Sequence, residues 1–446
     1  MHIFQALDRN YVFDTGSGSL FEIDEVALAV LELWPAFSTK QIMAELEGRF
    51  SSVSIEEAAN ELSDMLSDGV LNSEIPLEPS ASNAVPEVKA LCLHVAHDCN
   101  LRCLYCFAGT GNFGGERTMM DFETGKAAID FLLKSSGSRR NLEVDFFGGE
   151  PLLNFQVVKQ IVAYGEKVQT EHGKNIRFTL TTNATLLGKE EIDFLNEKKM
   201  AVVVSLDGRP EINDRMRPFN GGHGSHESVS KAIVDFVKSR DTKNYYVRGT
   251  FTRHNLDFTK DIEHLYALGL REISLEPVVA AEKEDYAIRS EHLPRLFLEY
   301  DKLARFYLDK EASGDGFNFF HFNMATYNGP CFAKRVTGCG AGYDYVAITP
   351  EGELYPCHQF VGQEQFKLGN VFLGIENFSL SARFRAANLY HKEDCSSCWA
   401  RFLCSGGCHA NAYYANGDLL SPDQISCALQ KKRIECSLAL VARKTV

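Results

Sequence analysis

The sequence predicts an α/β protein in which a partial (β/α)6 barrel follows a small amino-terminal domain and precedes a cysteine-rich domain. Three observations indicate this order. Six short apolar runs alternate with amphipathic stretches in the middle of the chain, prolines interrupt the chain before them, and cysteines gather after them. We therefore expect a first domain at residues 1–72, a linker at 73–86, the barrel at 87–310 and the last domain at 311–446.

The composition is that of a folded protein, because 45% of the 446 residues are apolar. No apolar run is long enough to cross a membrane, and the first residues lack the features of a signal peptide. We therefore expect a cytoplasmic protein with no membrane partner. The net charge of −14 repels phosphates, so nucleic acid is not an expected partner.

The first domain is predicted to combine three short strands with three helices. The strands are expected at residues 3–7, 10–13 and 20–23, and a capping box at 54–57 predicts the start of a helix that Gly69 ends. Strands and helices in this number indicate a winged-helix domain. Residues 1–75 hold fourteen acidic and three basic residues, which argues against DNA binding. Solvated helix faces and a peptide-docking surface both remain open.

Residues 73–86 contain three prolines and no periodic pattern, so they are predicted to be a linker. The barrel strands that follow are predicted at residues 90–95, 142–147, 176–181, 201–206, 245–252 and 272–276. Helices are expected between and after them, for example at 121–134, 155–168 and 292–308. In such folds the functional groups lie at the carboxyl ends of the strands. The chain from 327 to 427 has so little periodicity that we expect loops held by metal clusters.

The thirteen cysteines are distributed unevenly along the chain. None precedes Cys92, four lie between Cys92 and Cys106, and nine lie between Cys331 and Cys436. In a reducing compartment such clusters indicate metal or iron–sulfur ligands and argue against disulfides. Cys92 and Cys436 stand in a predicted strand and a predicted helix, so we expect both to be core or partly buried thiols.

Cys99, Cys103 and Cys106 follow the first barrel strand with the spacing C-x3-C-x2-C. Three thiolates can hold a four-iron cluster with one iron left open, whereas a structural zinc site needs a fourth ligand. The sequence Gly-Gly-Glu-Pro at 148–151 follows the second strand, where glycine lets the backbone approach a ligand closely. A zinc loop on a β/α protein is the alternative interpretation.

These motifs resemble the radical S-adenosylmethionine (SAM) superfamily, in which Tyr105 would be the aromatic residue of the cysteine signature. The resemblance implies that the open iron chelates SAM and that one electron cleaves it to a 5′-deoxyadenosyl radical. A further motif of the superfamily resembles residues 213–217, with Asn213 in place of its usual histidine. The resemblance implies that Arg217, at the end of this motif, contacts the methionine carboxylate of SAM. A surface arginine is the alternative. The implied SAM contacts are Tyr105, Gly148, Gly149, Glu150, Thr182, Asn183, Ser205, Asp207 and Arg217.

The later cysteines resemble the SPASM extension of radical SAM enzymes, which holds two auxiliary four-iron clusters. The resemblance implies one set of ligands at Cys395, Cys398, Cys404 and Cys427, and a second set at Cys339, Cys357 and Cys408. Three [4Fe-4S] clusters are therefore expected in total. We favour Cys331 as the eighth auxiliary ligand, and a substrate thiolate is the alternative. Paired zinc ribbons are the other interpretation of this pattern.

The order of domains resembles the maturases that form thioether crosslinks in ribosomally made peptides, most closely the SCIFF peptide maturases. This resemblance implies a cysteine-rich precursor peptide with a leader segment as substrate, and a reductant such as flavodoxin or ferredoxin. Anaerobic sulfatase maturases are the alternative, but they usually have an aspartate base where this chain has His358. His358 is either a base or a histidine with a structural hydrogen bond. A non-enzymatic electron-transfer protein is the third possibility.

Overall fold

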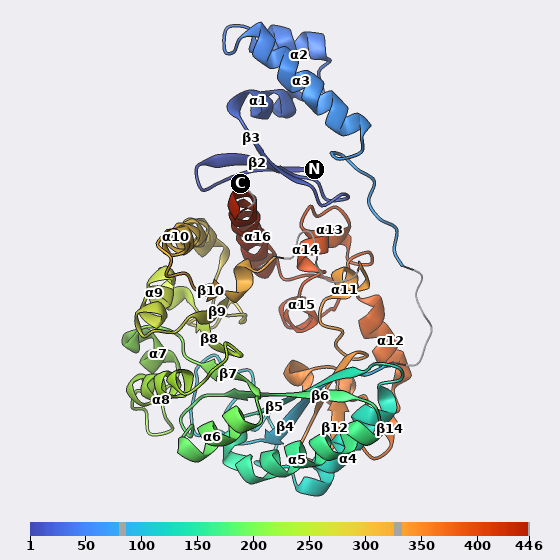
Figure 1. The fold of residues 1–446 in the computed structure, drawn as a ribbon. Coiled ribbons are helices and arrows are strands. Elements are labelled where there is room, and N and C mark those ends of the chain that lie inside the picture. The colour runs from blue at the N-terminus through green and yellow to red at the C-terminus, as the bar shows by residue number, and fades with distance from the viewer. Residues whose placement is uncertain (80–85, 325–331, 445–446) are drawn as a thin grey trace.

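The computed structural model describes residues 1–79, 86–324 and 332–444. Figure 1 shows a ring of strands and outer helices below, with the amino-terminal domain stacked above the end of the last helix. The amino terminus and the end of the last described helix therefore lie close to each other at this junction.

The amino-terminal domain has the predicted three strands followed by three helices. Its antiparallel sheet has the order β1 (His2–Ala6), β2 (Arg9–Phe13), β3 (Leu20–Ile23). The helices are α1 (Glu25–Leu33), α2 (Thr39–Leu46) and α3 (Ser52–Ser67). The predicted start of α3 was wrong, because Ser51 caps the helix by accepting a hydrogen bond from the backbone N–H of Ser54.

The small sheet packs on two sides. One face packs with α1–α3 in a separate apolar cluster that includes Val12. Phe4, Tyr11 and Phe13 instead belong to the main core of the molecule. The His2 ring stacks on Trp399 with centroids 3.8 Å apart. The strands of this domain are thus packed against the rest of the chain, whereas its helices have an apolar cluster of their own.

The six predicted barrel strands are present within one or two residues of their predicted ends, and all pair in parallel. They are β4 (Ala90–Ala96), β5 (Asn141–Gly148), β6 (Asn175–Thr182), β7 (Ala201–Ser205), β8 (Tyr245–Phe251) and β9 (Glu272–Pro277). All seven residues of β4 are buried, as expected for a central parallel strand. Helices cover the outside of the strands (Figure 1). They are α4 (Phe122–Ser135), α5 (Phe155–Glu171), α6 (Lys189–Glu197), α7 (Pro210–Met216), α8 (His226–Lys238), α9 (Thr259–Ala267) and α10 (Leu293–Ala312).

The carboxyl-terminal region extends the barrel sheet at both edges. β10 (Asn318–Phe319) pairs with β9, and β11 (Tyr345–Ile348) pairs in parallel with β4. Antiparallel strands β12 (Glu353–Tyr355), β13 (Gly369–Asn370) and β14 (Gly374–Ile375) continue from β11. The expectation of a region made of loops was therefore wrong for its described residues. The predicted boundary at 310/311 falls within one eleven-stranded sheet.

The carboxyl-terminal region also contains helices. They are α11 (Phe332–Thr337), α12 (Phe378–Ala386), α13 (Glu393–Ser396), α14 (Arg401–Cys404), α15 (His409–Asn416) and α16 (Gln424–Lys444). Helix α16 packs along α10 and reaches β1 and β3. It therefore runs from the middle of the molecule to the amino-terminal domain (Figure 1).

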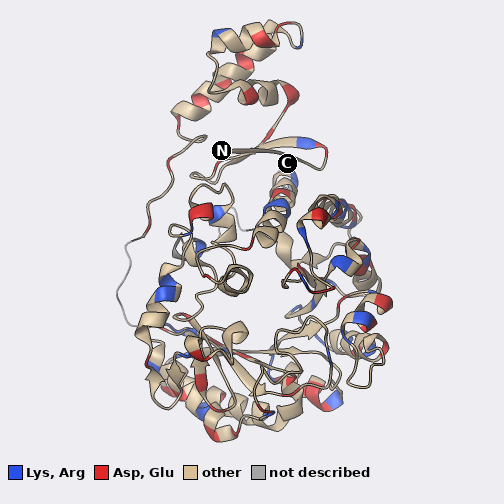
Figure 2. Ribbon diagram, turned by 180° about the vertical axis from the view of Figure 1, so that it is seen from behind, with Lys and Arg blue, Asp and Glu red and all other residues tan. Residues whose placement is uncertain are grey.

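The charged residues are unevenly distributed along the fold. Figure 2 shows mainly acidic residues on the amino-terminal helices, whereas acidic and basic residues are mixed over the barrel helices. None of the described helices combines the length and the apolar character that crossing a membrane requires.

Candidate active site

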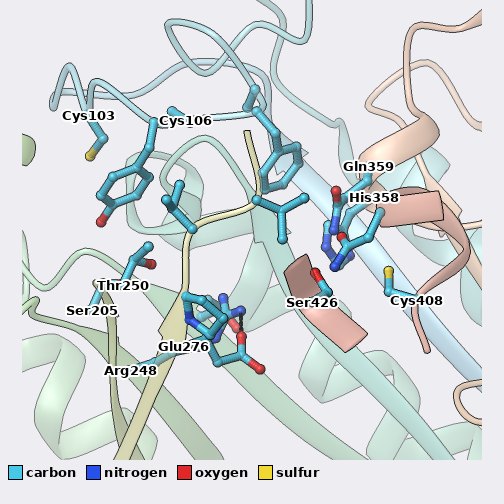
Figure 3. Close-up of a pocket in the computed structure, with 18 of the residues that line it drawn as sticks. Cys103, Cys106, Ser205, Arg248, Thr250, Glu276, His358, Gln359, Cys408 and Ser426 are labelled. Atoms are coloured by element: carbon cyan, nitrogen blue, oxygen red, sulfur yellow. Dashed lines mark hydrogen bonds and ion pairs between the residues drawn. The ribbon is translucent and has the colours of Figure 1, made fainter. Parts of the chain in front are cut away.

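A cavity of about 640 Å³ lies at the carboxyl ends of the barrel strands. Its walls come from the loop after β4, the ends of β5–β9, the loop before α15 and the first turns of α16. Figure 3 shows Cys103 and Cys106 on one side of this cavity and Cys408 on the other. The cavity thus joins the first cysteine motif to the second.

Cys99, Cys103 and Cys106 all line the cavity. A tight turn holds the motif, in which the backbone N–H of Cys106 donates to the carbonyl of Cys103 at 3.1 Å. Burial raises the pKa of both Cys99 and Cys103 to about 11. These thiols are therefore protonated before a metal cluster binds. Binding of the cluster must release the thiol protons, because metal ions take their place on the sulfur atoms.

Two glycines let the end of β5 approach this loop. A Cβ atom on Gly148 would overlap the carbonyl oxygen of Ala96, and one on Gly149 would overlap that of Asp98. Gly148 also has a φ of +124°, which side chains other than glycine rarely adopt. The pair is needed for the β4 loop and the end of β5 to meet, and both residues line the cavity.

Glu150 does not line the cavity but supports its wall. Its side chain is fully buried and accepts hydrogen bonds from Thr182 Oγ1 at 2.7 Å, from Asn183 N at 2.7 Å and from Leu152 N at 3.0 Å. Thr182 and Asn183 do line the cavity, as does Ser205 at the end of β7. The carboxylate of Glu150 therefore fixes the ends of β5 and β6 relative to each other.

Tyr105 connects two further predicted residues. Its hydroxyl donates to Asp207 Oδ2 at 2.7 Å and accepts from Arg217 Nη1 at 2.9 Å. Burial lowers the pKa of Arg217, but the neighbouring Cys103, Tyr105 and Asp207 outweigh it and raise this pKa well above its usual value. Arg217 lines the cavity and is only 8% exposed, so the surface-arginine alternative was wrong. Asp207 is fully buried behind it.

The later cysteines group in two sets. Cys395 and Cys427 interact electrostatically with each other and with Cys398 and Cys404, while burial raises their pKa values to about 11 and about 12. Cys357, Cys339 and Cys408 interact in the same way. The sequence pattern placed the same cysteines together, and their roles as cluster ligands stay a prediction. Cys404, Cys408 and Cys427 line the cavity.

The remaining cysteines differ in their surroundings. Cys92 in β4 and Cys436 in α16 are fully buried, as predicted. Cys331 lies outside the described residues.

Lys392 is a buried charged residue near the later cysteines that the sequence analysis missed. Its side chain is buried, and its Nζ donates to the carbonyl of Gly406 at 2.7 Å. Burial lowers the pKa of Lys392, whereas the nearby thiols of Cys395, Cys408, Cys404 and Cys427 act to raise it. The ammonium thus interacts electrostatically with thiols of both cysteine sets. The only signal in the sequence is its position three residues before Cys395.

His358 makes the structural contact that the sequence analysis considered, and its role as a base stays a prediction. It lines the cavity, and its Nδ1 lies 3.2 Å from the hydroxyl of Tyr345. Its ring also stacks on Phe147 with centroids 5.0 Å apart.

Comparison with known families agrees with these two motifs. Residues 93–257 match the radical SAM superfamily, and residues 339–399 match the SPASM family, described as an iron–sulfur cluster-binding domain. The chain contains a radical SAM domain and a SPASM domain. The first of these includes the loop of Cys99, Cys103 and Cys106, and the second includes Cys339, Cys357, Cys395 and Cys398.

Similar proteins match different parts of this chain. An uncharacterized protein of Methanocaldococcus jannaschii is 34% identical over 45% of this chain and 66% of its own length. The radical SAM cyclopropyl synthase TigE of Paramaledivibacter caminithermalis is 21% identical over 94% of this chain and 90% of its own. A cysteine-type anaerobic sulfatase-maturating enzyme of Clostridium novyi is 23% identical over 77% of this chain and 93% of its own.

Two solved structures share the fold. Native anSMEcpe with bound SAM superposes with a TM-score of 0.68 at 19% identity, over 80% of this chain and all of that one. Streptococcus suis SuiB bound to SAM superposes with a TM-score of 0.54 at 18% identity, over 94% of this chain and 99% of that one.

The two domains imply SAM and four-iron clusters as cofactors. The residues of the radical SAM domain fit this implication, because three thiols and the cationic Arg217 line one cavity. Thiols are the ligands of such clusters, and a guanidinium matches a carboxylate. The SPASM domain supplies further thiols across the same cavity.

Proposed function

We propose that this chain is a radical SAM enzyme that installs thioether crosslinks in a cysteine-rich, ribosomally made precursor peptide. The observation that supports this proposal most is that one cavity is lined by Cys99, Cys103 and Cys106 on one side and by Cys404, Cys408 and Cys427 on the other. A peptide in this cavity would contact both cysteine motifs at once. A thioether maturase needs that arrangement, because it acts on a carbon and a sulfur of one substrate.

Each group of residues would have a separate role. Cys99, Cys103 and Cys106 would hold one four-iron cluster, and the two later sets would hold two more. When bound, the first cluster and SAM supply the 5′-deoxyadenosyl radical that takes a hydrogen atom from the acceptor residue. Arg217, held by Tyr105, would bind the methionine carboxylate. The double glycine, Thr182, Asn183 and Ser205 would form the remaining wall of the SAM site.

The amino-terminal domain would bind the leader segment of the precursor as a winged-helix recognition domain. β3 is an edge strand of its sheet, so its free side offers backbone groups to an extended peptide. Binding there would raise the local concentration of the core peptide at the cavity. Coverage of 94% of this chain by TigE and SuiB must include most of this domain, which supports its pairing with the radical SAM barrel.

A sulfatase-maturase-like oxidation of a protein cysteine or serine is the second candidate. It is supported by the match to anaerobic sulfatase-maturating enzymes and by the superposition on anSMEcpe. His358, at the position where those enzymes usually have an aspartate base, counts against it. A purely electron-transferring protein would not need the double glycine or Arg217 beside the first cysteine motif.

The proposed enzyme would be cytoplasmic and would need a reductant such as flavodoxin or ferredoxin. Cys331 would complete the second auxiliary site. The variant Cys331→Ala tests this ligand through iron content and cluster spectra with and without peptide. Unchanged clusters with full crosslinking, and a spectral shift that depends on the substrate cysteine, would instead indicate ligation by the substrate.

The test of the proposed function is anaerobic co-expression with a cysteine-rich peptide encoded beside this gene. A thioether would make the peptide two hydrogen atoms lighter per crosslink, with the cysteine thiol no longer open to alkylation. A formylglycine product would favour the second candidate. A peptide of unchanged mass, in the presence of 5′-deoxyadenosine formation, would contradict thioether formation on that peptide.

A further inference from the structure

Two arginines on the floor of the cavity have no part in the SAM site described above. Arg248 lies in β8 and Arg433 in α16, and both line the cavity with Glu276 at the end of β9. Figure 3 shows Arg248 and Glu276 on the side of the cavity away from Cys103 and Cys106. The side chain of Arg248 is 53% exposed and that of Glu276 is 37% exposed, so both are open to molecules in the cavity.

The floor has a net positive charge, because Arg248 and Arg433 are cations and Glu276 is the one anion among these three side chains. Arg248 and Glu276 form an ion pair. Burial acts to raise the pKa of Glu276, but Arg248 and further neighbours including Arg433 outweigh it and lower this pKa to about 2. Glu276 is therefore charged, and its nearest cation is Arg248. His321, beside it, is neutral because burial and the charge of Arg433 lower its pKa to about 3.

Arg433 has no carboxylate partner of its own. Its guanidinium donates to the side-chain oxygen of Gln430, one turn earlier in α16, and among the described residues it forms no ion pair. The other carboxylate that lines the cavity, Asp423, caps α16 by accepting from the backbone N–H of Ser426 at 2.9 Å. The charge of Arg433 acts on the thiol of Cys404 and on Glu276, but neither forms an ion pair with it. A cavity arginine without a carboxylate in ion-pair contact is unusual in a chain with a net charge of −14.

We propose that Arg433, assisted by Arg248, binds a carboxylate of the substrate. This inference rests on the proposed function and names a chemical feature of its substrate, because the peptide segment in the cavity would carry an aspartate or glutamate side chain or end in a free carboxylate. An arginine pairs with a carboxylate through two parallel hydrogen bonds, which fixes direction as well as position. The floor would thus orient the peptide between the two cysteine motifs.

The test measures binding of short labelled peptides to the full chain, reconstituted anaerobically and saturated with SAM. The probes are acetylated Gly-Cys-Gly-Gly-X-Gly amides in which X is Asp, Glu, Asn or Gln, and an X = Gly peptide with a free carboxyl end. We expect an acidic or free-acid probe to bind about 10- to 100-fold more tightly than the neutral amides, as charged hydrogen bonds in a cavity do. The acidic and free-acid arms distinguish the two sources of carboxylate.

Variants of Arg433 test whether the floor of the cavity causes the preference for acidic over neutral probes. Arg433→Gln should abolish the preference for the acidic probe, and Arg433→Lys should retain part of it. Arg383→Gln, on the exposed side of α12, is the matched control and should retain all of it. Iron content and melting temperature show whether each variant is folded.

Equal affinity for all probes, or no measurable affinity for any, would overturn the proposal, whatever the variants do. Formation of 5′-deoxyadenosine by the same preparation reports on the proposed function separately. An enzyme that cleaves SAM but ignores the carboxylate would therefore disprove only the carboxylate site.

Discussion

Arg217 donates a hydrogen bond of 2.9 Å to the hydroxyl of Tyr105, which in turn donates to Asp207. The three side chains come from the cysteine loop, the end of α7 and the end of β7. Tyr105 is thus more than an aromatic spacer between Cys103 and Cys106, because it anchors the arginine that faces the cavity.

Replacing Tyr105 by Phe should weaken SAM binding. The variant keeps the ring but loses the hydrogen bonds to Arg217 and Asp207, and bonds to charged groups contribute about 1.5–3 kcal/mol each. We expect the SAM dissociation constant, measured by equilibrium dialysis, to rise about tenfold or more, with iron content unchanged. Tyr164→Phe is the control, since the hydroxyl of Tyr164 bonds to Asp130 on the outer helices at 2.5 Å. Unaltered affinity in Tyr105→Phe would refute the anchoring role.

Asp145 should make the protein less stable as the pH rises from about 4 to about 7. Burial raises its pKa from 3.8 to about 7, against the opposing effects of Thr181 and Arg248. In that range the folded chain keeps a proton that the unfolded chain releases. The contribution of Asp145 to the free energy of unfolding therefore falls as the pH rises and is constant above about pH 7. Asp145→Asn should therefore stabilise the protein at pH 8 by on the order of 3 kcal/mol, after allowance for partial exposure, and leave it unchanged at pH 4.

Denaturant unfolding of the apo-protein at both pH values measures this effect. Asp130→Asn, on the outer helix α4, is the control and should show little difference between the two values. A variant of Asp145 that is no more stable than the wild type at pH 8 would mean that the carboxylate is not strained by burial.

Lys392 should raise the reduction potentials of the auxiliary clusters. Its buried ammonium faces Cys395, Cys404, Cys408 and Cys427, and a nearby positive charge favours the more negative, reduced form of a cluster. In Lys392→Met we expect potentials lower by on the order of 50–100 mV, from the Coulomb energy of one charge at a few ångströms. Potentiometric titration followed by electron paramagnetic resonance measures the shift. Lys367→Met, which loses a lysine paired with Glu353, should leave the potentials in place.

Trp399 should hold the amino-terminal sheet on the SPASM domain. It stacks on His2 and contacts the Phe13 ring edge-on at 6.2 Å. Because the indole is partly exposed, Trp399→Ala should cost about 2 kcal/mol and speed hydrogen exchange in β1 and β2. Glu435→Gln removes only a partly exposed ion pair with His2 and should have a smaller effect. Unchanged exchange in Trp399→Ala would show that the sheet is held by other contacts.

The sequence identified those parts of the fold that have strong patterns. The six barrel strands are buried apolar runs, and their ends were predicted within one or two residues. β13 and β14 have only two residues each, which is too short for any periodicity to be recognised. The start of α3 was misplaced because Ser51 and Ser54 are both acceptable caps, and only the structure decides between them.

The candidate site was likewise predictable from the sequence only in part. The cysteine spacing indicated both sets of thiols, because ligand spacing is local in sequence. Arg248, Lys392 and Arg433 have no such signal, since they reach the cavity or the thiols from three different elements. Glu150 was expected to contact SAM, yet its carboxylate faces Thr182 and the Asn183 backbone, which only the pairing of β5 and β6 reveals.

In the proposed enzyme, Cys99, Cys103 and Cys106 hold the cluster that cleaves SAM. The most direct measurement compares iron content and 5′-deoxyadenosine formation of the reconstituted wild type with the triple variant in which all three are Ala. Three clusters predict close to twelve irons in the wild type, and the variant should lose about four of them and all SAM cleavage. SAM cleavage retained by the triple variant, or zinc in place of iron at these sites in the wild type, would contradict the account.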